Sequence, residues 1–263
     1  MRDQIAQLPM YDWPEVRAAT DALWAKIHIA LQKQSVASPG TLDREKSRDT
    51  TWLSPRLLLS QTCGLPLVQH LRDQVAILGR FTYQNLPVDG DYHSVIITRR
   101  TESINHPSDL LDKRAAINHE DSYSGCLALK RWVSTLGEST AFFSKVIETG
   151  SHRNSVRAVA DGLVDTAAID HVSWCLAKRV EPAAKTLRVI AKTDDRPGLP
   201  LITRPDHDIK ALSNLQLALN EAATMLDPVS RTARGITGFV AAEYQDYDVI
   251  NNDFQQFGSN SLS

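Results

Sequence analysis

Apolar and polar residues alternate along the chain in two kinds of pattern. Short apolar runs predict strands, at 5–10, 57–61, 75–81, 92–98, 115–118, 146–149, 166–170 and 187–191. Between them, apolar residues recur at helical spacing. The clearest case is the face formed by Val16, Leu23, Trp24, Ile27 and Leu31. Short strands that alternate with helices predict an α/β fold with mainly parallel sheets.

The strand–helix pattern starts afresh near Glu102, which predicts two lobes. We expect lobe 1 to comprise 1–98 plus 200–263 and lobe 2 to comprise 99–199, with the turn Pro197–Pro200 as a return hinge. Asp12 precedes a helix start and is expected to cap it. The polar tail after Asp253 is expected to be poorly ordered.

Composition narrows the function classes. The 263 residues carry a formal net charge of −2, without a basic stripe that would indicate nucleic-acid binding. Cys63, Cys126 and Cys175 lack metal-ligand spacing, and no nucleotide loop or catalytic triad is visible. No apolar run approaches the ~20 residues of a membrane span. We therefore expect no metal, no cofactor, no nucleic-acid partner and no membrane insertion, and we expect a monomer.

One stretch, Asn118–Cys126, carries the strongest candidate chemistry. It lies between a predicted strand and a predicted helix, and it holds Ser122, Tyr123 and Ser124. Hydroxyls and free backbone N–H groups at a helix start favour an anion. The alternative is that a serine only caps the helix. No arginine lies in this loop, so binding would depend on dipoles and neutral donors.

Further motifs stand where strands end, the edge at which ligands bind in open α/β sheets. Several of them, taken in order, resemble phosphonate-type substrate-binding proteins of ABC transporters over about residues 5–240. The residues that carry the likeness are Leu8-Pro9-Met10-Tyr11, Gln61-Thr62-Cys63-Gly64, Tyr92-x-Ser94, Ser122-Tyr123-Ser124-Gly125, Thr149-Gly150-Ser151-His152 with Ser155, and Asp165–Asp170.

The resemblance implies a type II periplasmic-binding-protein fold. Two lobes joined by two crossover strands, near 98–103 and 192–200, would close on a ligand in a cleft between them. It implies a small phosphonate- or phosphate-like anion as ligand and an ABC permease as partner. The expected ligand-binding residues are Tyr11, Gln61, Thr62, Tyr92, Ser122, Tyr123, Ser124, His152 and Asp170. Family members commonly have a small hydroxyl residue where Tyr123 stands, so the ligand stays open.

Three functions remain open at this point. The first is a binding protein that presents its ligand to a permease; the second is a ligand sensor that signals to a protein partner. The third is an enzyme with Cys63 or His152 catalytic, which lacks a recognisable base and orienting acid. We expect no enzymatic activity. The resemblance implies a periplasmic location. No signal peptide is visible in the sequence, which leaves a cytoplasmic location as the alternative.

Overall fold

The computed structural model describes residues 4–137 and 142–263, which divide into two compact units. The first unit is Met1–Asp91 with Pro197–Asp248, and the second is Tyr92–Arg196 with Val249–Ser263. The chain therefore passes between units at 91–92, at 196–197 and once more at 248–249. The short strands β4 (Asp91–Tyr92) and β10 (Arg196–Pro197) pair with each other at the first two passages.

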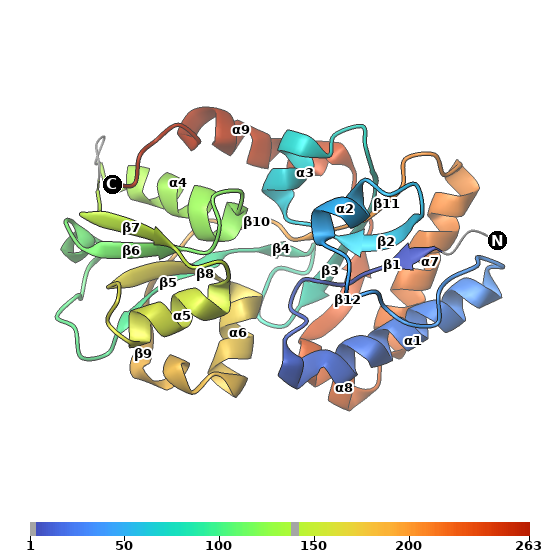
Figure 1. The fold of residues 1–263 in the computed structure, drawn as a ribbon, viewed down its shortest axis with the longest axis horizontal. Helices are drawn as coiled ribbons and strands as arrows, with labels where there is room; N and C mark the ends of the chain where they lie inside the picture. Colours follow the sequence, from blue (N-terminus) through green and yellow to red (C-terminus); the bar gives the residue numbers. More distant parts are fainter. Residues whose placement is uncertain (1–3, 138–141) are drawn as a thin grey trace. The chain divides into compact units, whose positions relative to one another are not determined.

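The first unit contains one mixed five-stranded sheet, in the order β1-β2-β11-β3-β12 (Figure 1). Its strands are β1 (Ile5–Ala6), β2 (Leu57–Gln61), β3 (Ala76–Tyr83), β11 (Pro200–Thr203) and β12 (Ile236–Val240). Only β1 and β2 run parallel as neighbours, because β11 lies between β2 and β3 and runs antiparallel to both. The sheet is thus mixed, and the prediction of a mainly parallel sheet is wrong here.

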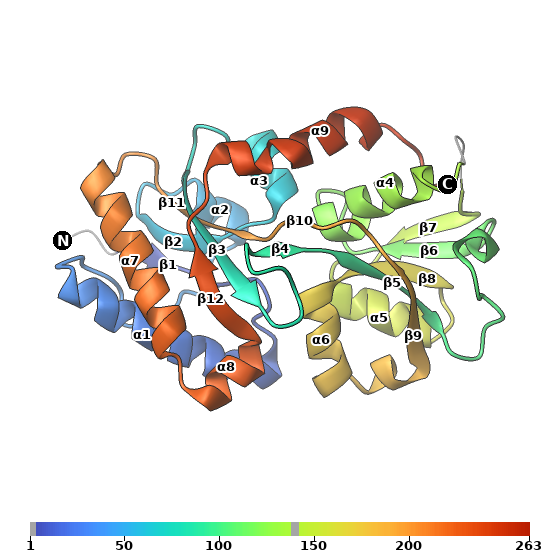
Figure 2. The ribbon, with the colours of Figure 1, turned by 180° about the vertical axis from the view of Figure 1, so that it is seen from behind.

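Helices cover this sheet. They are α1 (Arg17–Lys33), α2 (Arg48–Trp52), α3 (Gly64–His70), α7 (Ile209–Met225) and α8 (Pro228–Arg234). Helix α1 contacts α7 and α8, and the three lie side by side in Figure 2. The predicted apolar face of α1 is confirmed, since Leu23, Trp24, Ile27 and Leu31 are all buried. Asp12 forms no cap; its carboxylate instead accepts a hydrogen bond from Arg44 Nε at 2.6 Å.

The second unit also has a mixed sheet, in the order β7-β6-β8-β5-β9. Its strands are β5 (Ser94–Arg99), β6 (Arg114–Ile117), β7 (Lys145–Glu148), β8 (Thr166–Asp170) and β9 (Leu187–Lys192). Strands β6, β7 and β8 are parallel, whereas β5 pairs antiparallel with both β8 and β9. Its helices are α4 (Ala128–Ser134), α5 (His152–Ala160), α6 (His171–Val180) and α9 (Asp248–Phe257).

Single turns of 3-10 helix complete the chain at Pro14–Val16, Pro107–Leu110, Pro182–Thr186 and Tyr244–Tyr247. Among the described residues, no helix is both long and apolar enough to cross a membrane.

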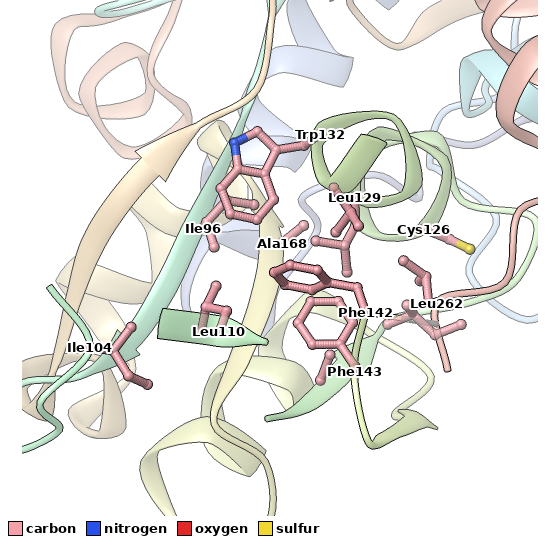
Figure 3. Close-up of a cluster of buried hydrophobic side chains, with 13 residues drawn as sticks. Ile96, Ile104, Leu110, Cys126, Leu129, Trp132, Phe142, Phe143, Ala168 and Leu262 are labelled. Atoms are coloured by element: carbon pink, nitrogen blue, oxygen red, sulfur yellow. The ribbon is translucent and has the colours of Figure 1, made fainter. Parts of the chain in front are cut away.

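The C-terminal segment packs on the second unit. Leu262 is 6% exposed and belongs to an apolar cluster with Phe142, Phe143 and Trp132 (Figure 3). The backbone N–H of Phe143 donates to the carbonyl of Leu262 at 2.8 Å. The expectation of a poorly ordered tail is therefore wrong. Residues 249–263 group with the second unit, although the prediction assigned all of 200–263 to lobe 1.

Candidate functional site

The Ser122–Gly125 turn of the second unit connects β6 to α4. Ser122 is extended and its Oγ accepts a hydrogen bond from the N–H of Gly125 at 3.1 Å. The following turn, Tyr123–Leu127, is a π-helix in which the N–H of Leu127 donates to the carbonyl of Ser122 at 3.1 Å. Short π-helical segments of this kind are frequent at functional sites. Ser122 is thus a helix cap, as one of the two sequence interpretations held.

The same turn meets the start of α5. Ser124 Oγ lies 2.9 Å from Nε2 of His152 and 3.5 Å from Oγ of Ser122. Ser94 Oγ donates to the carbonyl of Ser124 at 2.8 Å and holds the turn against β5. Three predicted residues, Ser122, Ser124 and His152, are therefore brought together in space. The starts of two helices supply the N–H groups that an anion needs.

Asn118 belongs to this cluster, although the sequence prediction did not select it. Its Oδ1 is buried and accepts no hydrogen bond among the described residues. A Cβ built on Gly125 would lie 1.8 Å from that oxygen and 3.2 Å from Cε1 of His152. Only glycine allows the turn to approach Asn118 and His152 this closely. The available signal was the position of Asn118, directly after the last residue of β6.

His152 is neutral at physiological pH. The residue as a whole is partly exposed, but its imidazole is enclosed, and this burial lowers the pKa of His152 to about 4. Nδ1 of the ring is buried and has no hydrogen-bond partner among the described residues, and the nearby backbone of Ala168 opposes the fall in pKa only in part. The ring can therefore donate or accept a hydrogen bond beside Ser124 without adding a positive charge.

The buried imidazole should make stability depend on pH. Its pKa of about 4 lies below the ordinary histidine pKa of 6.5, so unfolding takes up a proton between these pH values and stability falls as the pH falls through them. We expect His152→Gln to reduce the loss of unfolding free energy between pH 7 and pH 5 by roughly 1–2 kcal/mol. Urea unfolding of both proteins at the two pH values measures this, and equal losses would contradict the prediction.

Two other predicted residues of this unit have structural partners. The phenol of Tyr123 donates a hydrogen bond to Oδ2 of Asp253 at 2.6 Å, and burial together with this bond raises the pKa of Tyr123 far above its usual range. Oδ1 of Asp170, which is 1% exposed, accepts from the N–H of Ser173 at 2.8 Å and caps α6. A direct contact of either side chain with a ligand stays a prediction.

Gln61 and Thr62 are predicted residues of the first unit. Gln61 ends β2, is 1% exposed, and neither atom of its carboxamide has a hydrogen-bond partner among the described residues. Thr62 Oγ1 donates to the carbonyl of Cys63 at 3.3 Å. An unpaired buried amide costs roughly 1–3 kcal/mol, so Gln61 is a group that a ligand can satisfy.

Two tyrosines complete the predicted set. Tyr11 has a φ of 63°, packs edge-on against the ring of Tyr83 at 5.5 Å, and its carbonyl accepts from Arg234 Nη1 at 2.6 Å. Tyr92 is 3% exposed in β4. The positive φ of a non-glycine residue marks strained backbone of the kind that collects at functional sites.

Metal and thiol chemistry have little support in these residues. Across residues 4–137 and 142–263, no group of three His, Cys, Asp or Glu side chains is placed to hold a metal ion. Cys63, the candidate nucleophile, stands at the N-cap of α3 and is 9% exposed. Burial raises the pKa of the Cys126 thiol to about 11, which makes Cys126 a poor nucleophile.

Comparison with known proteins identifies the family. The model of the family "ABC transporter, phosphonate, periplasmic substrate-binding protein" matches residues 59–247. No curated protein matches the chain by sequence.

Solved structures match over almost the whole chain. XAC2383 from Xanthomonas citri bound to ATP has a TM-score of 0.71 at 18% identity and covers 98% of both chains. PhnD1 from Prochlorococcus marinus in complex with methylphosphonate has 0.72 at 17%, covering 97% of both. A binding protein component of an ABC phosphonate transporter from Pseudomonas aeruginosa has 0.74 at 15%, covering 97% of this chain and 87% of its own.

The solved structures establish the fold and the family model establishes the relationship, because that model spans more than two thirds of the chain. The chain belongs to the periplasmic substrate-binding proteins of phosphonate ABC transporters.

Proposed function

We propose that this solute-binding protein captures a small phosphonate- or phosphate-like oxyanion at the Ser122–Gly125 turn. The observation that carries the proposal is the cluster of buried Ser122 and Ser124 with neutral His152, in which Ser124 Oγ lies 2.9 Å from the imidazole. Hydroxyls, backbone N–H groups and a neutral ring bind an oxyanion through dipoles. PhnD1, which has the same fold, is known in complex with methylphosphonate.

The unpaired carboxamide of Gln61 supports a contribution from the first unit. It offers one acceptor and two donors at the end of β2, the position where open α/β sheets bind ligands. Tyr11 and Thr62 are the further candidates there, and Tyr92, Tyr123 and Asp170 are those of the second unit. Closure of the two lobes on the ligand stays a prediction.

Removing the hydroxyls tests the location of the site. We expect Ser122→Ala/Ser124→Ala to weaken methylphosphonate or phosphate binding by on the order of 1–3 kcal/mol, the usual loss for hydrogen bonds to a charged group. Isothermal titration calorimetry measures the affinity. Ser134→Ala is the matched control, because it removes a hydroxyl from the other end of the same helix. Equal affinities in the double variant and the control would refute this location.

Proteins of this family bind solutes for transport. The ligand would be presented to an ABC permease in the periplasm, without chemical change. Following the ligand by ³¹P NMR during a long incubation distinguishes binding from turnover. Consumption of the ligand that disappears in His152→Gln would favour the enzyme alternative, in which His152 is catalytic.

A further inference from the structure

A polar cavity lies within the first unit and is lined by none of the residues of the Ser122–Gly125 turn. It has a volume of about 210 Å³ and lies between the end of β1, the start of α1 and the segment 42–48. The N–H of Asp43 donates to the carbonyl of Ala6 at 2.8 Å, which holds that segment against the edge of the sheet. We call this cavity the N-terminal pocket. At ~30 Å³ per water it has room for a small oxyanion with its hydration.

Cations outnumber carboxylates in the lining of the N-terminal pocket. The four cations are Arg17, Arg44, Lys46 and Arg48, and the two carboxylates are Asp12 and Asp43. Arg44 pairs with Asp12 and with Asp21, Lys46 with Asp43, and Arg48 with Asp49. Carboxylates thus engage three of the four cations.

Asp43 stays ionised and does not add a donor to the pocket. Burial opposes its ionisation, but hydrogen bonds from Lys46 and from backbone N–H groups hold the pKa of Asp43 at about 2. The lining therefore keeps a surplus of cations over anions at neutral pH.

Arg17 is the cation of the lining whose charge is least balanced by carboxylates. It is exposed and has no ion-pair partner in the described part of the chain. It is also the first residue of α1, which continues the 3-10 turn Pro14–Val16. A bound anion would therefore balance the charge of Arg17.

Gln7 gives the pocket a directional acceptor. The residue is 2% exposed, and its Nε2 donates to the carbonyl of Lys46 at 3.0 Å. This bond fixes the orientation of the carboxamide, because the reversed amide would set two oxygens against each other. Oε1 is buried and accepts no hydrogen bond among the described residues. A ligand that satisfies it must bring a donor of its own.

We propose that the N-terminal pocket binds an oxyanion that carries a hydroxyl, with monohydrogen phosphate as the simplest member of the class. The cations bind the charged oxygens, and Oε1 of Gln7 accepts the hydrogen bond of the protonated oxygen. Sulfate has the same charge and shape at neutral pH but no proton to donate. The pocket should therefore prefer phosphate to sulfate.

The test uses the full chain with Ser122→Ala/Ser124→Ala as background, so that the turn of the second unit contributes little. Phosphate and sulfate are titrated in turn at pH 7 into ¹⁵N-labelled protein and followed by NMR. We expect phosphate to shift the side-chain amide of Gln7 and the backbone amides of 43–46, with affinity at least fivefold above that for sulfate. Arg17→Gln should weaken phosphate binding about tenfold.

Two further variants separate the contributions. Gln7→Met keeps the volume but removes the acceptor, so the ratio of phosphate to sulfate affinity should approach one. Arg56→Gln is the matched control, since Arg56 is an exposed arginine of the same unit outside the pocket and should leave phosphate affinity unchanged.

Three results would overturn the proposal. They are equal affinity for phosphate and sulfate in the background protein, shifts confined to residues outside the pocket, and equal effects of Arg17→Gln and Arg56→Gln. The exposed position of Arg17 keeps the test valid if Gln7→Met does not fold.

Discussion

Replacing Asp253 by Ala should lower the free energy of unfolding by about 3–5 kcal/mol, the range for removing one partner of a buried ion pair. Asp253 is 5% exposed and lies at the centre of the second unit's C-terminal contacts. Its carboxylate accepts from Arg196 Nε at 2.7 Å, from Arg131 Nε at 3.1 Å and from the Tyr123 phenol at 2.6 Å. The variant leaves two guanidinium groups without this carboxylate and the phenol without its acceptor.

Urea unfolding measures the change, and the chain offers a matched control. Asp194 also pairs with Arg131, but its side chain is 62% exposed, so Asp194→Ala should cost less than about 1 kcal/mol. Asp253→Asn keeps an acceptor for Tyr123 and should fall between the two. Losses for Asp253→Ala and Asp194→Ala that agree within error would show that the cluster around Asp253 does not stabilise the unit.

Local patterns were enough to locate most secondary structure. Strands β2 and β8 have the predicted bounds, Leu57–Gln61 and Thr166–Asp170, because both are completely buried and each contains three consecutive apolar residues. These elements are formed by residues close together in the chain, so the local order of apolar and polar residues is enough to predict their positions.

The direction of a strand in its sheet and the packing of the C-terminal segment depend on residues far away in the sequence. Strands β5 and β11 lie beside the passages between units and enter their sheets antiparallel to their neighbours. Nothing in an apolar run records its direction. The tail reads as polar, yet Asp253 is matched by charges of Arg131 and Arg196, and Leu262 fills an apolar cluster. A sequence does not show such long-range pairs.

The candidate site likewise has one part that the sequence predicts and another that depends on long-range contacts. The hydroxyls of the Ser122–Gly125 turn were found because a strand, a short polar loop and a helix follow one another. The contact of Ser124 with His152 joins positions 28 residues apart and needed the fold. The buried oxygen of Asn118 was missed, since a lone Asn after a strand usually makes a turn.

Gly125→Ala should be the most damaging single change in the Ser122–Gly125 turn. The new Cβ would lie 1.8 Å from Oδ1 and 2.7 Å from Cγ of Asn118, distances that force side chain or backbone to move. We expect a loss of about 1–3 kcal/mol in unfolding free energy, the usual cost of overpacking. Because the same movement displaces Ser124 from His152, anion affinity should fall at least about tenfold, or ~1.4 kcal/mol.

A double-mutant cycle with Asn118→Ala identifies the cause. Removing the Asn118 carboxamide takes away the two atoms closest to the new Cβ and leaves Cε1 of His152 at 3.2 Å. The double variant should therefore be more stable than Gly125→Ala alone, with an interaction free energy of about 1 kcal/mol or more. Gly40→Ala is the control, because a Cβ there meets no atom within 4 Å. Additive effects of Gly125→Ala and Asn118→Ala would show that glycine is needed at position 125 for another reason than the approach of Asn118.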